Sequence, residues 1–405
     1  MKILVVLPRF PYPLEKGDKL RAFNQIKGLR AQGNDIILFC LSHEHVRNEW
    51  QEALRPYCSA IYVVKVSNVS SLLRVLGAFI CHRCLQTAYW NSSKPRRLFR
   101  QVEQLHRPDV IYSQMVRTIP IVQQSKCRKV MDFQDCLSLN MERNMLRFET
   151  SRPTGTADNG VHHYCHKASL RYFVYHYEFK KLRKLEEQAF SLFDALTIIS
   201  QPDCDALPSS HRQEVYIVPN GVDLEYYHPQ EAEKKFDVAF CGNMQYEPNI
   251  RTAVYLATQV MPLVWSKHPQ ARLLIAGATP VAEVWRLANE RVEVRANVPD
   301  IRQCYASTKV FAAPMQSGSG LQNKLLEAMA MEIPCVTSSL ANNSLGADGQ
   351  EVLVGDTPQE VARHILYLLD SQQQRDILTD NARHFVRTHY AWQVANEKLN
   401  AILQG

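Results

Sequence analysis

The feature that most constrains the fold is a regular alternation of short β-branched runs with longer amphipathic stretches. This alternation predicts parallel sheets that are covered by helices on both faces. A first series of expected strands comprises Lys2–Leu7, Asp35–Cys40, Ile61–Lys65, Asp109–Ser113, Lys129–Asp132 and Ala195–Ile199. A second series comprises Val215–Val218, Asp237–Cys241, Arg272–Ala276, Arg291–Val294, Lys309–Ala313, Cys335–Thr337 and Glu351–Val354. Helical patterns between the strands include Lys19–Ala31, Leu170–Ser191, Ile250–Lys267 and Leu321–Met331.

Two such series in 405 residues predict an α/β protein with two Rossmann-like, doubly wound parallel-sheet domains. Pro202 and Pro208 interrupt the pattern, which puts the expected break within residues 201–214. We therefore expect an N-terminal domain over residues 1–200 and a C-terminal domain over residues 201–388. The polar segment Phe148–Lys167 is expected to be a loop. Ligands of open parallel sheets bind outside the carboxyl ends of the strands, so two facing domains would line one cleft.

Composition indicates a cytoplasmic globular protein. The chain is 46% apolar and 21% charged, and its 11 cysteines follow no regular framework, which suits reduced thiols. The first apolar run ends at Leu7 and is too short for a signal peptide. A transmembrane helix needs about 20 apolar residues, and we expect none.

Charge is distributed unevenly along the chain. Residues 1–200 contain 30 Lys and Arg against 17 Asp and Glu, whereas residues 201–405 contain 17 against 23. The basic N-terminal half suits an anionic partner or simply a solvated surface. The apolar run Ser70–Ile80 precedes Lys94, Arg96, Arg97 and Arg100. A segment that is apolar and then basic could rest on an anionic membrane surface, or it could form two core helices with a charged outer face.

Two candidate groups lie in the N-terminal half. Gly17 could let the backbone approach an anionic ligand, with Asp18 as the helix N-cap and Lys16 and Arg21 adding charge. An ordinary strand-to-helix turn is the alternative. Asp132 and Asp135 follow an expected strand and could position an acceptor hydroxyl or accept its proton. Their alternative role is helix capping and turn formation.

The C-terminal half carries glycines where strands end. Gly242, followed by Asn243, and Gly277 could allow close approach of a phosphate or sugar, although a set of tight turns would also use them. The sharpest segment is Gly318-Ser319-Gly320-Leu321, which leads into an expected helix whose N–H groups could hold a diphosphate.

Two charged residues of that helix complete the candidate site. Lys324 and Glu327 are three residues apart and share a face of the helix. Lys324 can neutralise charge on a leaving diphosphate, and Glu327 can accept hydrogen bonds from ribose hydroxyls. A surface Lys–Glu pair is the alternative.

Two cysteine–histidine groups invite a zinc interpretation. They are Cys81-His-Arg-Cys84 and His162-His-Tyr-Cys-His166. Structural zinc needs four converging ligands, and one C-x-x-C with a distant loop cluster is a weak match, so no metal site is expected.

The chain resembles the GT-B glycosyltransferases, in particular the retaining family 4 group. Within that group it is similar to bacterial sugar transferases associated with exopolysaccharide and PEP-CTERM gene clusters. The matching stretches are Pro11–Arg21, Asp132–Asp135, Val218–Asp223, Cys241–Met244, Gly318–Ala330 and Tyr390–Trp392. The resemblance spans nearly the whole chain.

The resemblance implies hexosyl transfer from a nucleotide-diphosphate sugar to a glycan or lipid-linked acceptor, with retention, in polysaccharide biosynthesis. Glu327 would hold the ribose, Lys324 and the Gly318–Gly320 loop would bind the diphosphate, and Gly17 would belong to a loop that closes on the donor. A helix over residues 389–405 would return to the N-terminal domain. No metal or other cofactor and no nucleic acid are expected, and the basic N-terminal domain could contact the inner face of the plasma membrane.

Departures from the family pattern keep two alternatives open. Ser319 stands where the family has the first of two glutamates, and Asn243 lies near the place of an Arg…Lys pair. The end of the fifth strand has Asp132 and Asp135 in place of a histidine. The alternatives are a nonhydrolysing sugar-nucleotide epimerase and a degenerate, non-catalytic binding protein of the same fold.

Overall fold

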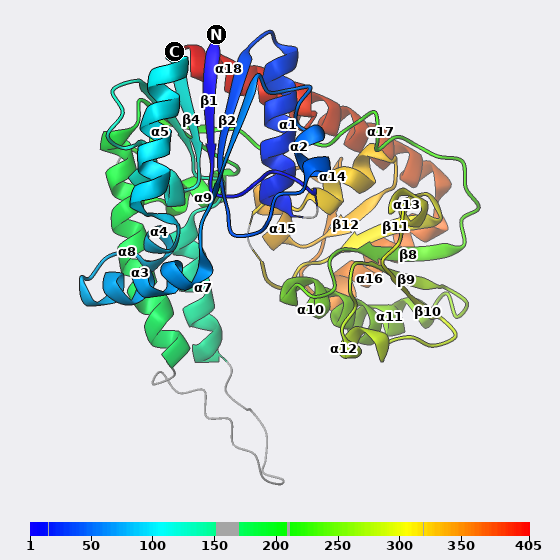
Figure 1. Ribbon diagram of the computed structural model, residues 1–405. Helices are drawn as coiled ribbons and strands as arrows, with labels where there is room; N and C mark the ends of the chain where they lie inside the picture. The colour runs from blue at the N-terminus through cyan, green and yellow to red at the C-terminus, as the bar shows by residue number, and fades with distance from the viewer. Residues whose placement is uncertain (15, 151–169, 209–210, 319) are drawn as a thin grey trace. The chain divides into compact units, whose positions relative to one another are not determined.

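The computed structural model describes residues 1–14, 16–150, 170–208, 211–318 and 320–405, which form two compact units (Figure 1). The first unit comprises Met1–Val218 and Asn396–Gly405, and the second comprises Pro219–Ala395. Each unit has one wholly parallel sheet and its own hydrophobic core. The prediction of two doubly wound α/β domains is confirmed.

The first sheet has seven strands in the order β3-β2-β1-β4-β5-β6-β7. The inner strand β1 is buried from Ile3 to Leu7, because helices cover both faces of the sheet. The strands are β1 (Lys2–Leu7), β2 (Asp35–Ser42), β3 (Ala60–Lys65), β4 (Val110–Gln114), β5 (Arg128–Asp132), β6 (Ala195–Ile198) and β7 (Val215–Ile217).

The helices of the first unit follow the strands in chain order. Figure 1 shows α7 and α8 as a long antiparallel pair that extends beyond the carboxyl edge of this sheet, with α3 and α4 nearby. The helices are α1 (Gly17–Ala31), α2 (Asn48–Glu52), α3 (Asn68–Ile80), α4 (Leu85–Trp90), α5 (Ser93–His106), η1 (Val116–Thr118), α6 (Ile119–Val122), α7 (Leu137–Thr150), α8 (Leu170–Leu192), α9 (Gln201–Ala206) and η2 (Arg212–Glu214).

The second sheet has six strands in the order β10-β9-β8-β11-β12-β13. They are β8 (Phe236–Cys241), β9 (Leu273–Gly277), β10 (Val292–Ala296), β11 (Thr308–Ala313), β12 (Cys335–Thr337) and β13 (Leu353–Val354). The helices are α10 (Glu247–Tyr255), the π-helical turn η3 (Leu256–Val260), α11 (Met261–Trp265), α12 (Ala282–Trp285), α13 (Arg302–Ala306), α14 (Asn323–Ala330), α15 (Ser339–Leu345), α16 (Pro358–Asp370), α17 (Gln372–His389) and α18 (Trp392–Gln404), whose last residues belong to the first unit.

One strand lies in a different sheet from the one expected. The run Val215–Val218 was grouped with the second series, but β7 pairs in parallel with β6 and forms the edge of the first sheet. The assignment was wrong because the segment with Pro202 and Pro208 connects β6 to β7 within the first sheet, and Pro202 lies in the first turn of its short helix, α9. The apolar pattern of a strand does not say which sheet it joins.

Two smaller features concern the polar segment expected to be a loop and the glycine at position 221. Phe148–Thr150 of the expected loop belongs to α7, and residues 151–167 lie outside the described residues. A Cβ atom on Gly221 would lie 2.6 Å from the Trp392 backbone nitrogen. The turn therefore needs glycine so that the start of α18 can approach it.

Candidate functional site

The carboxyl end of the second sheet brings together most of the predicted donor-site residues. Lys324, in the first turn of α14, reaches across to Asn249 in α10 with 2.6 Å between Nζ and Oδ1. A Cβ atom on Gly318 would lie 3.6 Å from Cβ of Pro248, which also belongs to α10. The starts of these two helices therefore lie side by side, where N–H groups and helix dipoles favour anions.

The Lys324 ammonium is oriented by neutral oxygens. It donates to Asn249 Oδ1 and, at 3.2 Å, to Gln322 Oε1, and it lies 5.2 Å from the centre of the Phe240 ring. Burial lowers the pKa of Lys324 to about 8, although the nearby Glu327 favours the charged form. Neutral oxygens hold the ammonium without cancelling its charge, so the group can bind an anion.

The Glu327 carboxylate, one turn further along α14, is held by two phenols. The Tyr305 hydroxyl donates to Oε2 at 2.8 Å, and Tyr227 also donates to this carboxylate. Burial raises the pKa of Glu327, while the phenols and Lys324 oppose that effect. Lys324 and Glu327 are half-buried and bonded to different partners, so they do not form the surface pair that was the alternative.

The strand-end glycines are explained by close packing. A Cβ atom on Gly242 would lie 2.7 Å from Asn249 Nδ2. Gly277 has a φ of +150°, and a Cβ atom there would lie 1.7 Å from the Gly242 carbonyl oxygen. Asn243 is exposed and accepts a hydrogen bond from the backbone N–H of Gln245 at 3.0 Å, which shapes the turn into α10. These contacts account for both glycines before any ligand is considered.

The loop before α14 has an unusual backbone. Gly318 has a φ of +125° and Gly320 a φ of +72°, in a region that other residues rarely adopt. Leu321 packs against the second core and anchors the end of the loop. Ser319 lies outside the described residues.

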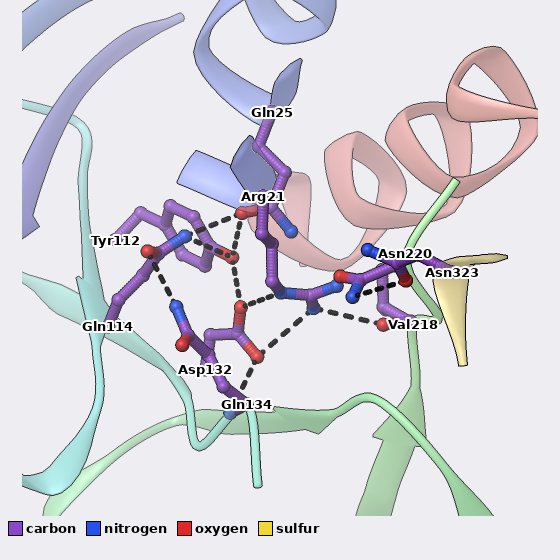
Figure 2. A network of polar contacts seen from close by, with 9 residues as sticks. All are labelled: Arg21, Gln25, Tyr112, Gln114, Asp132, Gln134, Val218, Asn220 and Asn323. Carbon is purple, nitrogen blue, oxygen red and sulfur yellow. Dashed lines mark hydrogen bonds and ion pairs between the residues drawn. The ribbon is translucent and has the colours of Figure 1, made fainter. Parts of the chain in front are cut away.

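In the first unit, Arg21 and Asp132 form a buried ion pair (Figure 2). Arg21 Nε donates to Asp132 Oδ2 at 2.7 Å, and an η nitrogen of Arg21 donates to Oδ1 at 3.1 Å. The same η nitrogen also donates to the Val218 carbonyl at 2.9 Å. Arg21 is 1% exposed and Asp132 is fully buried. Arg21 is thus occupied within the protein, whereas the sequence suggested it as a ligand for phosphate.

A ring of polar side chains surrounds this pair (Figure 2). The Tyr112 hydroxyl donates to Asp132 Oδ2 at 2.9 Å, and the Gln134 backbone N–H donates to Oδ1 at 3.2 Å. Gln114 Nε2 donates to Gln25 Oε1 at 2.5 Å. Both Asp132 oxygens therefore accept two hydrogen bonds each, which favours the turn-forming alternative for this residue over a catalytic one.

Asp135 lies in a different environment from Asp132. It is half-buried, and burial together with the nearby Asp203 raises its pKa to about 7, against the opposing effect of Arg21. Since a carboxyl group with a pKa near neutrality can both accept and release a proton, Asp135 is the better candidate for proton transfer.

A small cavity of about 10 Å³, with room for roughly one water molecule, lies at the carboxyl ends of β1, β4 and β5. Met115 and Gln134 in its wall have φ values of 62° and 63°, which are unusual for residues other than glycine. Backbone of this kind is concentrated at functional sites. The polar residues of the wall, which can bond hydroxyl groups, are Arg9, Asp18, Lys19, Gln114 and Gln134.

The start of α1 differs in detail from the expectation. The helix begins at Gly17 with Lys16 as its N-cap, so Asp18 is in the first turn and is not the cap. Asp18 instead pairs with Arg9 at 3.1 Å, beside the cavity. A Cβ atom on Gly17 would meet nothing within 4 Å, so packing within the described residues does not require a glycine there.

The zinc interpretation receives no support from the described part of the chain. No three His, Cys, Asp or Glu side chains among the described residues are grouped so as to hold a metal. Cys84 contacts Glu178, and Cys81 is an exposed free thiol. The cluster His162–His166 lies outside the described residues.

Several site residues were missed by sequence reasoning. Tyr227, Tyr305 and Asn249 contact Glu327 or Lys324, and Tyr112 and Gln25 complete the network around Asp132. Asn249 could have been found, because it stands in the first turn of a helix that follows Gly242 directly. The tyrosines lie on other elements and carry no local signal.

The chain has two Rossmann-like units, each with polar residues at the carboxyl ends of its parallel strands. This is the arrangement of GT-B proteins. The Anabaena protein Alr3699/HepE, solved in complex with UDP and glucose, matches the chain with a TM-score of 0.66 at 13% identity. The match covers 99% of both chains. The chain therefore has the GT-B fold.

Residues 235–371 match the family model described as Glycosyl transferases group 1. This range contains Gly242, Gly277, Lys324 and Glu327 of the candidate site. The second unit thus carries a group 1 glycosyl transferase domain, and the chain is a GT-B glycosyltransferase.

Two sequence relatives extend the comparison. An uncharacterized 44.6 kDa protein in the cps region of Klebsiella pneumoniae is 21% identical over 96% of each chain. A GDP-mannose-dependent monoacylated alpha-(1-6)-phosphatidylinositol monomannoside mannosyltransferase of Corynebacterium glutamicum is 27% identical, over 56% of this chain and 65% of the relative.

Proposed function

We propose that the protein transfers a hexosyl group from a nucleotide-diphosphate sugar to a glycan or lipid-linked acceptor, with retention, in polysaccharide biosynthesis. The observation that carries the proposal is the half-buried Lys324 ammonium, held by neutral oxygens where the starts of α10 and α14 meet. UDP in the Anabaena neighbour, the cps region of one relative and the phosphatidylinositol mannoside named for the other support the donor and acceptor classes.

The donor would be bound by the second unit. Lys324 and the N–H groups at the start of α14 would neutralise the diphosphate as its bond to the sugar breaks. Glu327, already oriented by Tyr305, would accept hydrogen bonds from the ribose hydroxyls. Gly242, Asn243 and Gly277, with the loop Gly318-Ser319-Gly320-Leu321, would form the surrounding wall.

The acceptor would be bound by the first unit. The cavity beside Gln114 and Gln134 would hold one acceptor hydroxyl. Gly17, which precedes Asp18 of the cavity wall, would belong to the loop that closes on the donor. The acceptor oxygen forms a bond to the anomeric carbon on the same face from which the phosphate oxygen departs, so that the configuration at that carbon is retained. Asp135 would take the acceptor proton, and Asp132 would position the end of β5. The groups named suffice for this step without a metal or other cofactor.

We also place the protein in the cytoplasm, in peripheral contact with the inner face of the plasma membrane through its basic N-terminal unit. Among the described residues, no helix is both long and apolar enough to cross a bilayer. A lipid-linked acceptor would be met at that surface.

A ligand screen tests the proposed function. The full chain should be stabilised against heating by one or a few sugar nucleotides, because a ligand that binds only the folded state raises its stability. Adding an extract of lipid-linked glycans with that donor should release the nucleoside diphosphate. Conversion of the sugar nucleotide without any acceptor would identify an epimerase. Binding of a sugar nucleotide that is not turned over with any acceptor would identify a non-catalytic protein.

The pH dependence of kcat/KM should be bell-shaped with a maximum between about pH 7 and pH 8. Asp135 has a pKa near 7 and must be ionised to accept a proton, so the rate should fall below that value. Lys324 has a pKa near 8 and must be protonated to bind the diphosphate, so the rate should fall above it. These values apply because kcat/KM reports the free enzyme.

Two variants assign the limbs of this profile. Lys324→Arg keeps a charge at every accessible pH, so it should remove the alkaline limb while retaining part of the activity. Asp135→Asn should lower the rate and remove the acidic limb. An alkaline limb that is unchanged in Lys324→Arg would exclude Lys324 as its source.

A further inference from the structure

Helix α3 of the first unit carries its apolar side chains on its outer face. Its exposed large apolar residues include Val69 and Ile80, which are 74% and 76% exposed. The others are Leu72, Leu73, Leu76 and Phe79. At 100° per residue these six positions fall within one face of the helix.

The opposite face of α3 attaches the helix to the protein through polar groups. Ser71 and Ala78 are its buried residues. The Ser71 hydroxyl donates to the Tyr89 carbonyl of α4 at 2.8 Å, and the Arg74 guanidinium donates to the Ala88 carbonyl at 3.2 Å. A helix of a globular protein ordinarily packs its apolar face on the core, so this orientation is inverted.

The apolar surface continues onto α8. The Phe79 ring lies 6.2 Å from the ring of Phe173, which is 52% exposed, and 5.2 Å from that of Tyr177. Contiguous exposed apolar surface marks an interaction site with a protein or a membrane. We define the docking face as the six apolar residues of α3 together with Phe173.

The surrounding charge favours a lipid surface over a protein. Residues 53–102, which include all of α3, contain no Asp or Glu. The Tyr177 hydroxyl donates to the Arg83 carbonyl, and Lys181 stacks over the Tyr177 ring at 5.4 Å, so basic residues border the docking face. The Lys and Arg residues of the stretch 53–102 are Arg55, Lys65, Arg74, Arg83, Lys94, Arg96, Arg97 and Arg100.

We infer that α3 is an interfacial membrane anchor, which lies in the plane of an anionic bilayer and inserts its docking face among the acyl chains. The helix has 13 residues, against about 20 needed to span a bilayer, so it lies on the membrane and does not cross it. Because α3 follows β3, it starts at the carboxyl edge of the first sheet, where the cavity also lies. The inference does not depend on the transfer reaction proposed above.

Vesicle flotation of the full chain tests this inference. The protein should float with vesicles of phosphatidylcholine and phosphatidylglycerol, and more weakly with pure phosphatidylcholine or at high salt. The triple variant Leu73→Ser, Leu76→Ser and Ile80→Ser should bind anionic vesicles at least tenfold more weakly. Since these side chains are exposed, the variant should keep the thermal stability of the parent.

A matched control changes three apolar residues that are exposed elsewhere, Leu105→Ser, Tyr367→Ser and Ile377→Ser. This control should float like the parent. Equal flotation of both triple variants would overturn the inference, and so would an absence of parent binding to anionic vesicles. A parent dimer in light scattering that only the α3 variant disrupts, without vesicle binding, would instead assign the face to self-association.

Discussion

Replacing Asp132 by alanine should destabilise the first unit by about 3–5 kcal/mol, because it leaves the buried Arg21 guanidinium without its carboxylate partner. Burial opposes the charge on Arg21, yet Asp132 and Tyr112 hold the pKa of this guanidinium above its ordinary value. The variant also removes the acceptor of the Gln134 N–H and one acceptor of the Tyr112 hydroxyl, which keeps Gln25 Oε1 at 3.0 Å. Denaturant unfolding, followed by hydrogen exchange of β5 peptides, should measure the loss.

The controls separate this ion pair from a general effect of losing an aspartate. Asp109→Ala removes a carboxylate that accepts an exposed hydrogen bond from the backbone N–H of Lys2, so it should cost less than about 1 kcal/mol. The double variant Arg21→Met with Asp132→Leu should be more stable than Asp132→Ala, since no buried charge remains uncompensated. Unfolding of Asp132→Ala at the parental denaturant concentration would show that the pair contributes nothing.

The elements of the fold were largely predictable because each depends on local pattern. Every run of β-branched residues in the two expected series forms a strand, and Lys2–Leu7 and Cys335–Thr337 match to the residue. Sheet membership was less predictable. The pairing of β7 with β6 is a non-local contact that leaves no trace in the three residues of the strand.

The candidate donor-site residues of the second unit were easier to predict from the sequence than the polar network of the first unit. Lys324 and Glu327 were predicted as donor-site residues because a glycine loop and a helix start follow one another in the chain, and that role stays a prediction. Arg21 and Asp132 were both noticed, but their pairing across 111 residues was not, because nothing local indicates that either side chain is buried. Gly277 was assigned to a ligand, although the Gly242 carbonyl already occupies the space of its missing side chain.

The orientation of helix α3 could not be predicted from its apolar run of sequence. The sequence allowed either a core helix or a membrane-facing one, since an amphipathic pattern shows that a helix has an apolar face but not whether that face points to the core or to the outside. The hydrogen bonds made by the polar face of the helix decide between the two. Ser71 and Arg74 reach carbonyls of α4, so the apolar face is left outside.

Lys324→Ala and Glu327→Ala should have the largest effects on transfer. Removal of a preorganised charge at a leaving group costs about 10²–10³ in kcat, and we expect this loss for Lys324→Ala. Glu327→Ala should weaken donor binding by tenfold or more. It also removes the 2.8 Å acceptor of the Tyr305 hydroxyl and leaves that hydroxyl with the Lys324 carbonyl at 3.5 Å, at a stability cost of about 1–3 kcal/mol. Steady-state rates with the donor identified by the ligand screen, and calorimetric titration with its nucleoside diphosphate, would measure both effects.

The second sheet itself offers a matched control for the lysine. Lys309 lies near the start of β11, at the opposite edge of the sheet from Lys324, and pairs with Asp237 at 2.9 Å. Lys309→Ala removes the same charge from the same unit, so it should leave the transfer rate within about twofold of the parent. If Lys324→Ala were as active as Lys309→Ala, the diphosphate would have to bind elsewhere. If Lys324→Ala bound the nucleotide normally but turned over slowly, the lysine would act on the leaving group alone, because an interaction made only in the transition state lowers kcat without weakening binding.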